Sequence, residues 1–176
     1  GVGGLGHLGI QFARHMGFRT VAIGRGCEKE KLAKEFGAHL YIDASVDDAA
    51  DALQRMGGAR AILATGTSGE GMGPLVSGLS ARGKLIVVGV RPDQIQLSAF
   101  PLVFGGRSVY GSLTGTAIDQ EDTLSFSVLE NIRPMIETAP LEQAADVYAR
   151  MMQGKARFRM VLVTTDGAAR SVRPAA

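Results

Sequence analysis

The stretch Gly1-Val2-Gly3-Gly4-Leu5-Gly6-His7 contains three glycines in the spacing G-x-G-x-x-G. In a strand–helix–strand unit this spacing lets a strand turn sharply into a helix beneath a pyrophosphate. Gly1 permits the turn, Gly3 lets the backbone approach the phosphates, and Gly6 lets helix and strand pack closely. The N–H groups at the start of the helix then face the anion. The motif therefore predicts a dinucleotide site, and a Gly-rich turn without a ligand is the alternative.

Short apolar runs alternate with helical patterns along the following hundred residues. We expect strands over residues 19–23, 40–42, 59–64, 84–90 and 107–113. We expect helices over residues 5–16, 28–36, 46–56 and 72–79. These strands are apolar enough to be buried on both faces, which is typical of a parallel, doubly wound sheet. The pattern predicts an α/β Rossmann domain over residues 1–113.

No strand precedes the glycine motif in this sequence, so we expect the first strand of the sheet to be missing from the chain. That strand is central in a doubly wound sheet, and without it two neighbouring strands have open edges. We considered three hypotheses: the natural chain extends upstream, a segment such as 158–163 fills the gap, or the chain associates with another.

The pattern changes after Thr114. Helical spacing over 118–132 is followed by a short extended piece over 134–138, an amphipathic helix over 141–152 and a strand over 158–163. We therefore expect a separate C-terminal α/β segment over residues 114–165. Residues 166–176 are polar and small, and we expect a disordered tail.

Composition excludes several classes of protein. The 176 residues include 19 Lys and Arg against 17 Asp and Glu, so a net charge of +2 gives no reason to expect nucleic acid or a membrane surface as a partner. No apolar run approaches the ~18 residues that a membrane span needs. Cys27 is the single cysteine, which rules out an internal disulfide and suits a reducing compartment. We expect a cytoplasmic protein.

The end of the strand over 19–23 bears on the choice of cofactor. NAD sites place Asp or Glu there to hold the ribose 2′-hydroxyl, but this chain has Gly24 followed by Arg25. Gly24 leaves room, and the Arg25 guanidinium matches a phosphate, which favours NADP, with NAD left open. Lys29 lies in the first turn of the next helix and could approach the ribose or its phosphate. For Arg25 and Lys29 the alternative is a solvated surface residue.

Three other strands end in small or polar residues. Thr65-Gly66, Gly89-Val90 and Ser112-Leu113 each follow a predicted strand. Ligands of open α/β sheets lie at the carboxyl edge where such strands end. Gly89 would let a flat ring lie against the backbone. These three turns are candidate cofactor contacts, and ordinary tight turns are the alternative.

The sequence offers no candidate for catalysis or for metal binding. His7, His15 and His39 lack metal-ligand spacing and are expected to be surface or packing residues. Cys27 has no partner for zinc, which needs three or four nitrogen or sulfur ligands. We predict no catalytic residue and no metal ligand in this chain.

The segments GVGGLGHLGIQFARHMG, KLAKEFGA and KLIVVGV resemble the medium-chain dehydrogenase/reductase superfamily. The GxGGLGH form is similar to its zinc-dependent alcohol dehydrogenase branch, whereas the zinc-free quinone and enoyl reductases usually carry a loop richer in Ala and Ser. The resemblance runs from Gly1 to about Val163. It implies a coenzyme domain that follows a GroES-like catalytic domain, which carries the zinc ligands and is absent here. Residues after about Thr114 would return to complete that catalytic domain.

The resemblance also implies roles for individual residues. Gly24 stands where NAD-dependent members have an acidic residue, and Lys29 matches a lysine that often reaches the adenosine ribose. Thr65-Gly66 would lie by the adenine-side ribose. The remaining roles are the pyrophosphate loop, Gly1, Gly3, Gly4, Leu5 and Gly6, and the backbone contacts to the nicotinamide carboxamide, Gly89, Val90, Ser112 and Leu113.

The function that follows is cofactor binding within a zinc-type alcohol dehydrogenase. The whole enzyme would transfer a hydride between NADP(H) and an alcohol/aldehyde or ketone pair, and this chain would bind cofactor without turnover. The alternatives are a zinc-free quinone or enoyl reductase, a non-enzymatic dinucleotide-binding module, and a truncation product without function. The family implies homo-oligomers joined edge to edge through the Rossmann sheet, for which residues 107–113 are the candidate edge.

Overall fold

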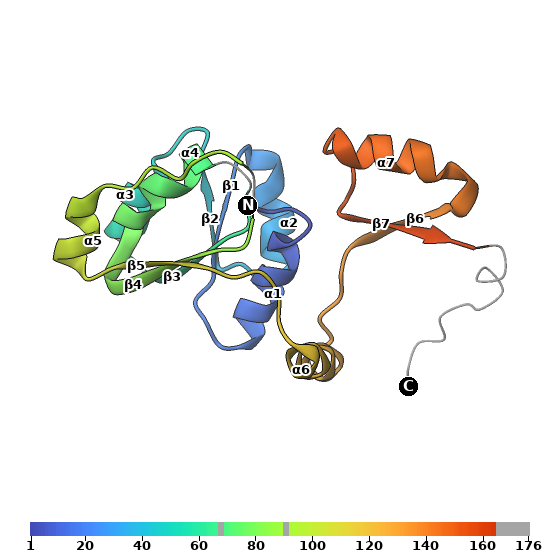
Figure 1. The fold of residues 1–176 in the computed structure, drawn as a ribbon, viewed down its shortest axis with the longest axis horizontal. Helices are drawn as coiled ribbons and strands as arrows, with labels where there is room; N and C mark the ends of the chain where they lie inside the picture. Colours follow the sequence, from blue (N-terminus) through green and yellow to red (C-terminus); the bar gives the residue numbers. More distant parts are fainter. Residues whose placement is uncertain (67–68, 90–91, 165–176) are drawn as a thin grey trace. The chain divides into compact units, whose positions relative to one another are not determined.

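The computed structural model describes residues 1–66, 69–89 and 92–164 and separates into two compact units, Gly1–Ile132 and Arg133–Ala176. Figure 1 shows the elements of each unit along the chain. Two predictions, the cofactor contact at Val90 and the tail over 166–176, lie outside the described residues.

The first unit alternates helices and strands from the glycine motif onward. Its elements are α1 (Gly6–His15), β1 (Val21–Gly24), η1 (Cys27–Lys29), α2 (Glu30–Glu35), β2 (Leu40–Asp43), α3 (Ala49–Arg55), β3 (Ala59–Ala64), α4 (Gly69–Met72), η2 (Gly73–Gly78), β4 (Leu79–Val87), α5 (Ala99–Gly105), β5 (Ser108–Gly111) and α6 (Ala117–Leu129). Here η denotes a short 3₁₀ helix. This order confirms the predicted parallel α/β fold of the Rossmann type.

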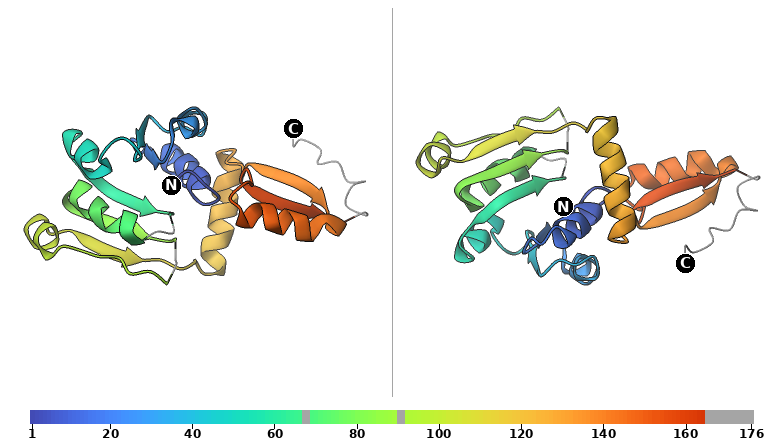
Figure 2. Two further views of the ribbon diagram at one scale, coloured as in Figure 1. Left: turned by 90° about the horizontal axis from the view of Figure 1, so that it is seen from above. Right: turned by 90° about the horizontal axis from the view of Figure 1, so that it is seen from below.

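The strands of the first unit form two parallel sheets. β1 pairs with β2, and β3, β4 and β5 pair in that order. Among the described strands no ladder joins β1 to β3, and Figure 2 shows the two sheets as separate ribbons. One edge of β1 and one edge of β3 therefore lack a strand partner. The prediction of open edges on two neighbouring strands is confirmed among the described strands.

The second unit is built around its own short sheet. Its elements are β6 (Ile136–Pro140), η3 (Leu141–Gln143), α7 (Ala144–Met152) and β7 (Arg159–Val163). β6 and β7 pair in parallel, with α7 as the crossover. Among the described strands β7 pairs with β6 alone, so the structure does not support the hypothesis that the segment over 158–163 fills the open position in the sheet.

A half-buried carboxylate links three segments of the second unit. Glu137 on β6 accepts a hydrogen bond from the Arg150 guanidinium at 2.7 Å and another from the backbone N–H of Arg157 at 2.6 Å. The Arg150 hydrogen bond, followed by that of Arg157, lowers the pKa of Glu137. These contacts tie α7 and the entry to β7 to β6.

The structure differs from the sequence-based expectation at two places between residues 69 and 105. The helix expected over 72–79 is a four-residue α4 followed by the six-residue 3₁₀ helix η2, in which Pro74 removes a backbone donor. An added Cβ at Gly73 would collide with the carbonyl oxygen of Gln96, so the chain passes close to this turn. Helix α5 was not predicted, because its apolar residues follow one another without helical spacing; Leu102 packs against the core, whereas Phe100, Val103 and Phe104 are exposed.

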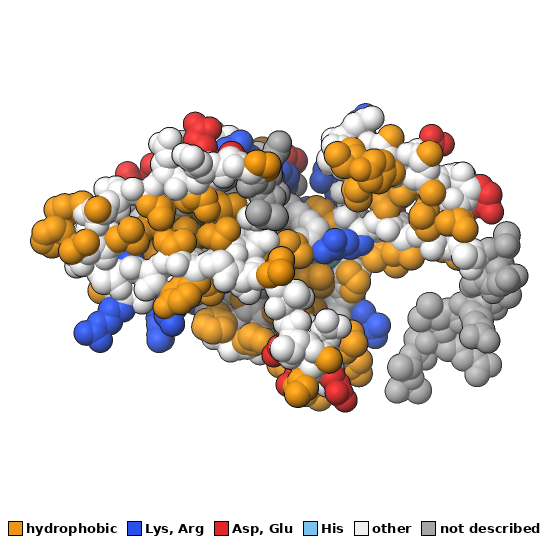
Figure 3. All heavy atoms as spheres, in the orientation of Figure 1, with side chains coloured by type: hydrophobic (Ala, Val, Ile, Leu, Met, Phe, Trp, Pro, Cys, Tyr) orange, Lys and Arg blue, Asp and Glu red, His pale blue; other side chains and the backbone are white. Residues whose placement is uncertain are grey.

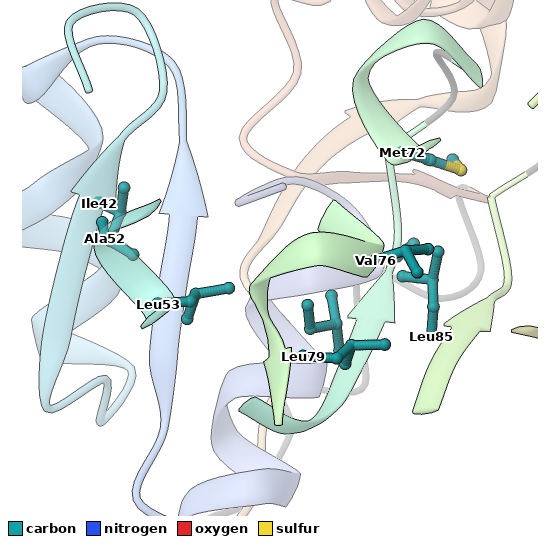
Figure 4. Close-up of a cluster of buried hydrophobic side chains, with 9 residues drawn as sticks. Ile42, Ala52, Leu53, Met72, Val76, Leu79 and Leu85 are labelled. Atoms are coloured by element: carbon teal, nitrogen blue, oxygen red, sulfur yellow. The ribbon is translucent and has the colours of Figure 1, made fainter. Parts of the chain in front are cut away.

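The hydrophobic core of the first unit joins α3 to both sheets. Leu79 and Leu85 of β4 are completely buried, and Val76 and Leu53 pack around them (Figure 4). Ile42 of β2 belongs to the same cluster as Ile62 of β3. The core thus crosses from one sheet to the other without a ladder between β1 and β3.

Truncation of Leu85 should destabilise the protein strongly. Leu85→Ala removes a fully buried side chain and leaves a cavity in the cluster, so we expect a loss of about 2–5 kcal/mol in the free energy of unfolding. Leu129→Ala is the matched control, because Leu129 is 78% exposed and should change stability by less than ~0.5 kcal/mol. Urea denaturation measures both. Equal losses would contradict this description of the core.

Candidate functional site

The glycine motif forms a loop that closes on the end of β3. The Thr65 hydroxyl donates a hydrogen bond to the carbonyl oxygen of Gly1 at 3.0 Å. An added Cβ at Gly6 would collide with that same carbonyl oxygen and lie 3.2 Å from the Thr65 hydroxyl. An added Cβ at Gly3 would meet nothing within 4 Å. Gly6 is thus required by the packing of the chain itself, whereas Gly3 leaves open space above the loop.

His7 supports this loop from inside the protein. Its side chain is completely buried, and its Nδ1 lies 2.9 Å from the carbonyl oxygen of Gly3. Because a carbonyl oxygen only accepts, Nδ1 is assigned as the protonated nitrogen that donates. The ring packs at a tilt against Phe36, with 5.3 Å between centroids. His7 is therefore a packing residue, one of the two roles expected for it.

Helix α1 begins at Gly6 without the usual side-chain cap. Leu5 occupies the N-cap position and makes no side-chain hydrogen bond there, and the first turn carries no acidic residue. An uncapped helix start with no negative charge is compatible with an anion at its backbone N–H groups. The open space above Gly3 lies in the same loop.

The corner after β1 is held by side chains of β2. The Tyr41 hydroxyl donates to the carbonyl oxygen of Gly26 at 2.8 Å, and the N–H of Gly26 donates to Asp43 Oδ1 at 2.9 Å. Gly26 has a φ of +88°, a left-handed conformation that favours glycine. The tight corner that carries Arg25 therefore has both backbone polar groups of Gly26 fixed.

Asp43 is ionised in this arrangement. Its Oδ1 also accepts from the hydroxyl and the N–H of Ser45, at 2.6 and 3.0 Å. The hydrogen bonds from Ser45, then the one from Gly26, hold the pKa of Asp43 below its usual range. The carboxylate therefore stabilises the corner at neutral pH, and this contribution is lost as the pH falls through the lowered pKa.

Two basic side chains stand at the same corner. Arg25 is exposed, and its guanidinium has no hydrogen-bond or ion-pair partner among residues 1–66, 69–89 and 92–164. Lys29 is half-buried, and its charge adds to the hydrogen bonds of Ser45 and Gly26 in lowering the pKa of Asp43. Lys29 thus lies near the end of β2.

The ends of β3, β4 and β5 lie side by side. The N–H of Gly89 donates to the carbonyl oxygen of Ala64, and that of Ser112 donates to Val87, at 3.1 and 2.9 Å. An added Cβ at Gly89 would collide with the carbonyl oxygen of Gly66. The structure thus brings Thr65, Gly66, Gly89 and Ser112 to one edge. Leu113 follows with its side chain 96% exposed.

Sequence reasoning missed Tyr41 and Asp43. Both lie on β2, whose register pairs Gly24 with Asp43. The available signal was an acidic residue at the end of the strand next to Gly24, since parallel strands end at the same edge. The Tyr41 contact had no sequence signal, because it joins residues on neighbouring strands.

Residues 4–129 match a family model described as zinc-binding dehydrogenase. The chain belongs to this family. It is 43% identical over 162 residues to the alcohol dehydrogenase notN of Aspergillus sp. (strain MF297-2), covering 92% of this chain and 48% of that protein. It is 35% identical over 163 residues to an alcohol dehydrogenase of Geobacillus stearothermophilus, covering 92% of this chain and 48% of that protein.

The fold is shared with solved structures of the same kind. The alcohol dehydrogenase of Aeropyrum pernix superposes with a TM-score of 0.83 and 25% identity, over 93% of this chain and 48% of that chain. The chain spans about half the length of the curated relatives it matches. These relatives are alcohol dehydrogenases, so the zinc-free reductase alternative is not favoured.

The described residues do not fit the zinc ion that the family name implies. Within the described ranges no three His, Cys, Asp or Glu side chains gather as a metal site. No helix in the same ranges has the length and apolarity to cross a membrane. The dinucleotide fits better, since the glycine loop offers an open backbone surface at Gly3 beside the strand ends.

The geometry of the glycine loop predicts that two alanine substitutions differ in their effect on stability. Gly6→Ala forces the Gly1 carbonyl and Thr65 apart, so we expect it to lower the free energy of unfolding by about 1–3 kcal/mol. Gly3→Ala is the matched control and should cost less than ~0.5 kcal/mol, because its Cβ points into open space. Thermal and urea unfolding measure both. A destabilisation by Gly3→Ala as large as that by Gly6→Ala would contradict this geometry.

Proposed function

We propose that this chain is the NADP(H)-binding part of an alcohol dehydrogenase that transfers a hydride between NADP(H) and an alcohol/aldehyde or ketone pair. The observation that carries the proposal is the glycine loop, which Thr65 closes at Gly1 and which stays open at Gly3. The family match and the alcohol dehydrogenase relatives support it. The nicotinamide supplies the hydride chemistry, and this chain holds and orients it.

Each part of the cofactor has a matching surface. The backbone of Gly3, Gly4 and Leu5 would face the pyrophosphate, while Gly1 and Gly6 shape the loop beneath it. Thr65 and Gly66 would lie by the adenine-side ribose. The nicotinamide carboxamide would be held by backbone groups of Gly89, Val90, Ser112 and Leu113. Since the described residues offer no metal cluster, we infer that this chain alone binds cofactor without turnover.

The preference for NADP is inferred from the corner after β1. Position 24 has no carboxylate for the ribose 2′-hydroxyl, and it is followed by Arg25, whose guanidinium has no partner among the described residues. A guanidinium binds phosphate in a bidentate, charge-assisted geometry. Lys29 adds a second positive charge to this corner. Together they favour a 2′-phosphate over a 2′-hydroxyl.

We further propose a homodimer through the outer edge of β5. Among the described strands, β5 pairs with β4 alone. Phe100, Val103 and Phe104 of the adjacent α5 are 69%, 73% and 78% exposed, and Figure 3 shows hydrophobic side chains gathered over this end of the unit. An open strand edge beside an apolar patch favours association.

The remaining expectations concern the rest of the chain and its surroundings. We assign residues 114–165 to the segment that returns to the catalytic domain, where the alcohol substrate would bind. The exposed, unpaired Cys27 fits a cytoplasmic protein, and a net charge of +2 gives no reason for nucleic acid or membrane partners.

Titration with NADPH and NADH, followed by nicotinamide fluorescence, tests the cofactor assignment. We expect NADPH to bind more tightly, and Arg25→Asp to weaken NADPH about 10-fold or more by removing a charged hydrogen bond to the 2′-phosphate. Arg82→Asp makes the same charge change near the start of β4, away from the strand ends, and should leave both affinities unchanged. Equal binding of the two cofactors would show that Arg25 does not recognise the 2′-phosphate and is an ordinary surface residue of the loop.

Sedimentation velocity tests the dimer. We expect the unmodified protein to sediment as a dimer and Phe104→Glu to sediment as a monomer, because a carboxylate in the apolar patch would be desolvated on association. Val46→Glu is the control at an equally exposed apolar residue, 80% exposed in the loop after β2. A monomer before any substitution would refute the proposed interface.

A further inference from the structure

Tyr41 of β2 lies against Gly24, the residue that ends β1. We propose that Tyr41 is a specificity-determining and positioning residue for the 2′-phosphate of the cofactor. Its hydroxyl occupies the space that a side chain at position 24 would need, and it fixes the corner that presents Arg25. This inference rests on the proposed function, because it concerns the same cofactor site.

The first step is the exclusion of a carboxylate at position 24. An added Cβ at Gly24 would collide with the Tyr41 hydroxyl and lie 3.1 Å from both Cε2 and Cζ of the ring. Any side chain there forces Tyr41 to move. Aspartate or glutamate at the end of this strand is what holds the ribose 2′-hydroxyl of NAD. While Tyr41 stays in place, the NAD-type contact cannot form.

The second step is the cost of moving Tyr41. Its hydroxyl donates to the carbonyl oxygen of Gly26 at 2.8 Å, while Asp43 Oδ1 accepts from the N–H of the same residue at 2.9 Å. Tyr41 and Asp43 are two residues apart on one strand and so project from the same face. If Tyr41 swings away, Gly26 keeps only one of its two anchors. A side chain at position 24 would therefore also loosen the corner.

The third step is the effect of this corner on charge. Asp43 directs Oδ1 toward three donors from Gly26 and Ser45, so its carboxylate is engaged within the corner. Arg25, in contrast, has no partner among the described side chains and is exposed. The residue between the two fixed positions, Gly24 and Gly26, thus carries the guanidinium that remains available. Tyr41 fixes its backbone without touching the phosphate.

Removal of the hydroxyl alone tests the positioning role. The probes are adenosine 2′,5′-bisphosphate and adenosine 5′-monophosphate, which differ only in the 2′-phosphate, and calorimetry on the 176-residue chain measures their affinities. We expect Tyr41→Phe to weaken the bisphosphate about 3- to 10-fold, as for loss of one hydrogen bond, and to change the monophosphate less than about twofold. Tyr148→Phe, at an exposed tyrosine of α7, is the matched control and should change neither affinity.

The outcomes separate the two proposals. If the unmodified protein binds the two probes equally, the NADP assignment fails and the role of Tyr41 fails with it. If it prefers the bisphosphate and Tyr41→Phe keeps that preference, or weakens both probes equally, only the role of Tyr41 is overturned. A purely structural residue would lower the melting temperature without changing the ratio of the two affinities.

A pair of substitutions tests the exclusion. We expect Gly24→Asp to weaken both probes, because the new side chain collides with Tyr41 and the two side chains cannot share the space beside the cofactor site. In Gly24→Asp/Tyr41→Val the space is free, so binding of the monophosphate should recover while the bisphosphate remains weak. If Gly24→Asp alone reverses the preference as fully as the double variant does, Tyr41 does not exclude the carboxylate. The conservative Tyr41→Phe variant keeps the proposal testable where the double variant fails to fold.

Discussion

The parallel pairing of strands is the constraint on which the site depends. Because β3, β4 and β5 run in the same direction, the turns that follow them meet at one edge, as do those that follow β1 and β2. The hydrogen bonds from Gly89 to Ala64 and from Ser112 to Val87 extend the ladder into these turns. Residues more than twenty positions apart in the sequence are thereby adjacent without any side-chain contact between them.

The same constraint explains why glycine is needed at particular points of this edge. Where turns from neighbouring strands converge, backbone approaches backbone, and a Cβ has no room. Gly6 faces the Gly1 carbonyl and Gly89 faces that of Gly66. Gly3 differs, since a Cβ added there would have no atom of the described residues within 4 Å. A glycine whose missing side chain is not required by the packing of the protein leaves room for a ligand. Gly3, and not Gly6, is therefore the glycine that supports the proposed pyrophosphate site.

Much of the fold was predictable from the sequence. The glycine motif and the alternation of apolar strands with helices gave the parallel α/β fold, and the strand over 59–64 matches β3 residue for residue. These features are local, since period and turn chemistry act over a few neighbouring residues. The helix expected over 72–79 is instead the short α4 followed by the 3₁₀ helix η2, which has Pro74 in its first turn.

The unpredicted parts depend on partners distant in sequence. Helix α5 is a run of consecutive apolar residues, so its sequence shows no stripe at helical spacing, although Leu102 packs against the core. The Tyr41 hydroxyl reaches Gly26 across fifteen positions, and an alternating strand pattern shows which face a residue occupies but not what lies opposite. The site residues predicted from the glycine motif are therefore those whose role is set by their own backbone.

Gly24 illustrates how one residue can carry two explanations. Read from the sequence, its missing side chain leaves room for a phosphate on the ligand. In the structure, part of that room is taken by the Tyr41 hydroxyl. The two explanations agree in excluding a carboxylate, but only the second accounts for a fixed corner, because the hydroxyl that lies over Gly24 also binds the Gly26 carbonyl. The glycine therefore serves the protein's own packing first, and the room left to a ligand at this corner is set by how firmly β2 holds it.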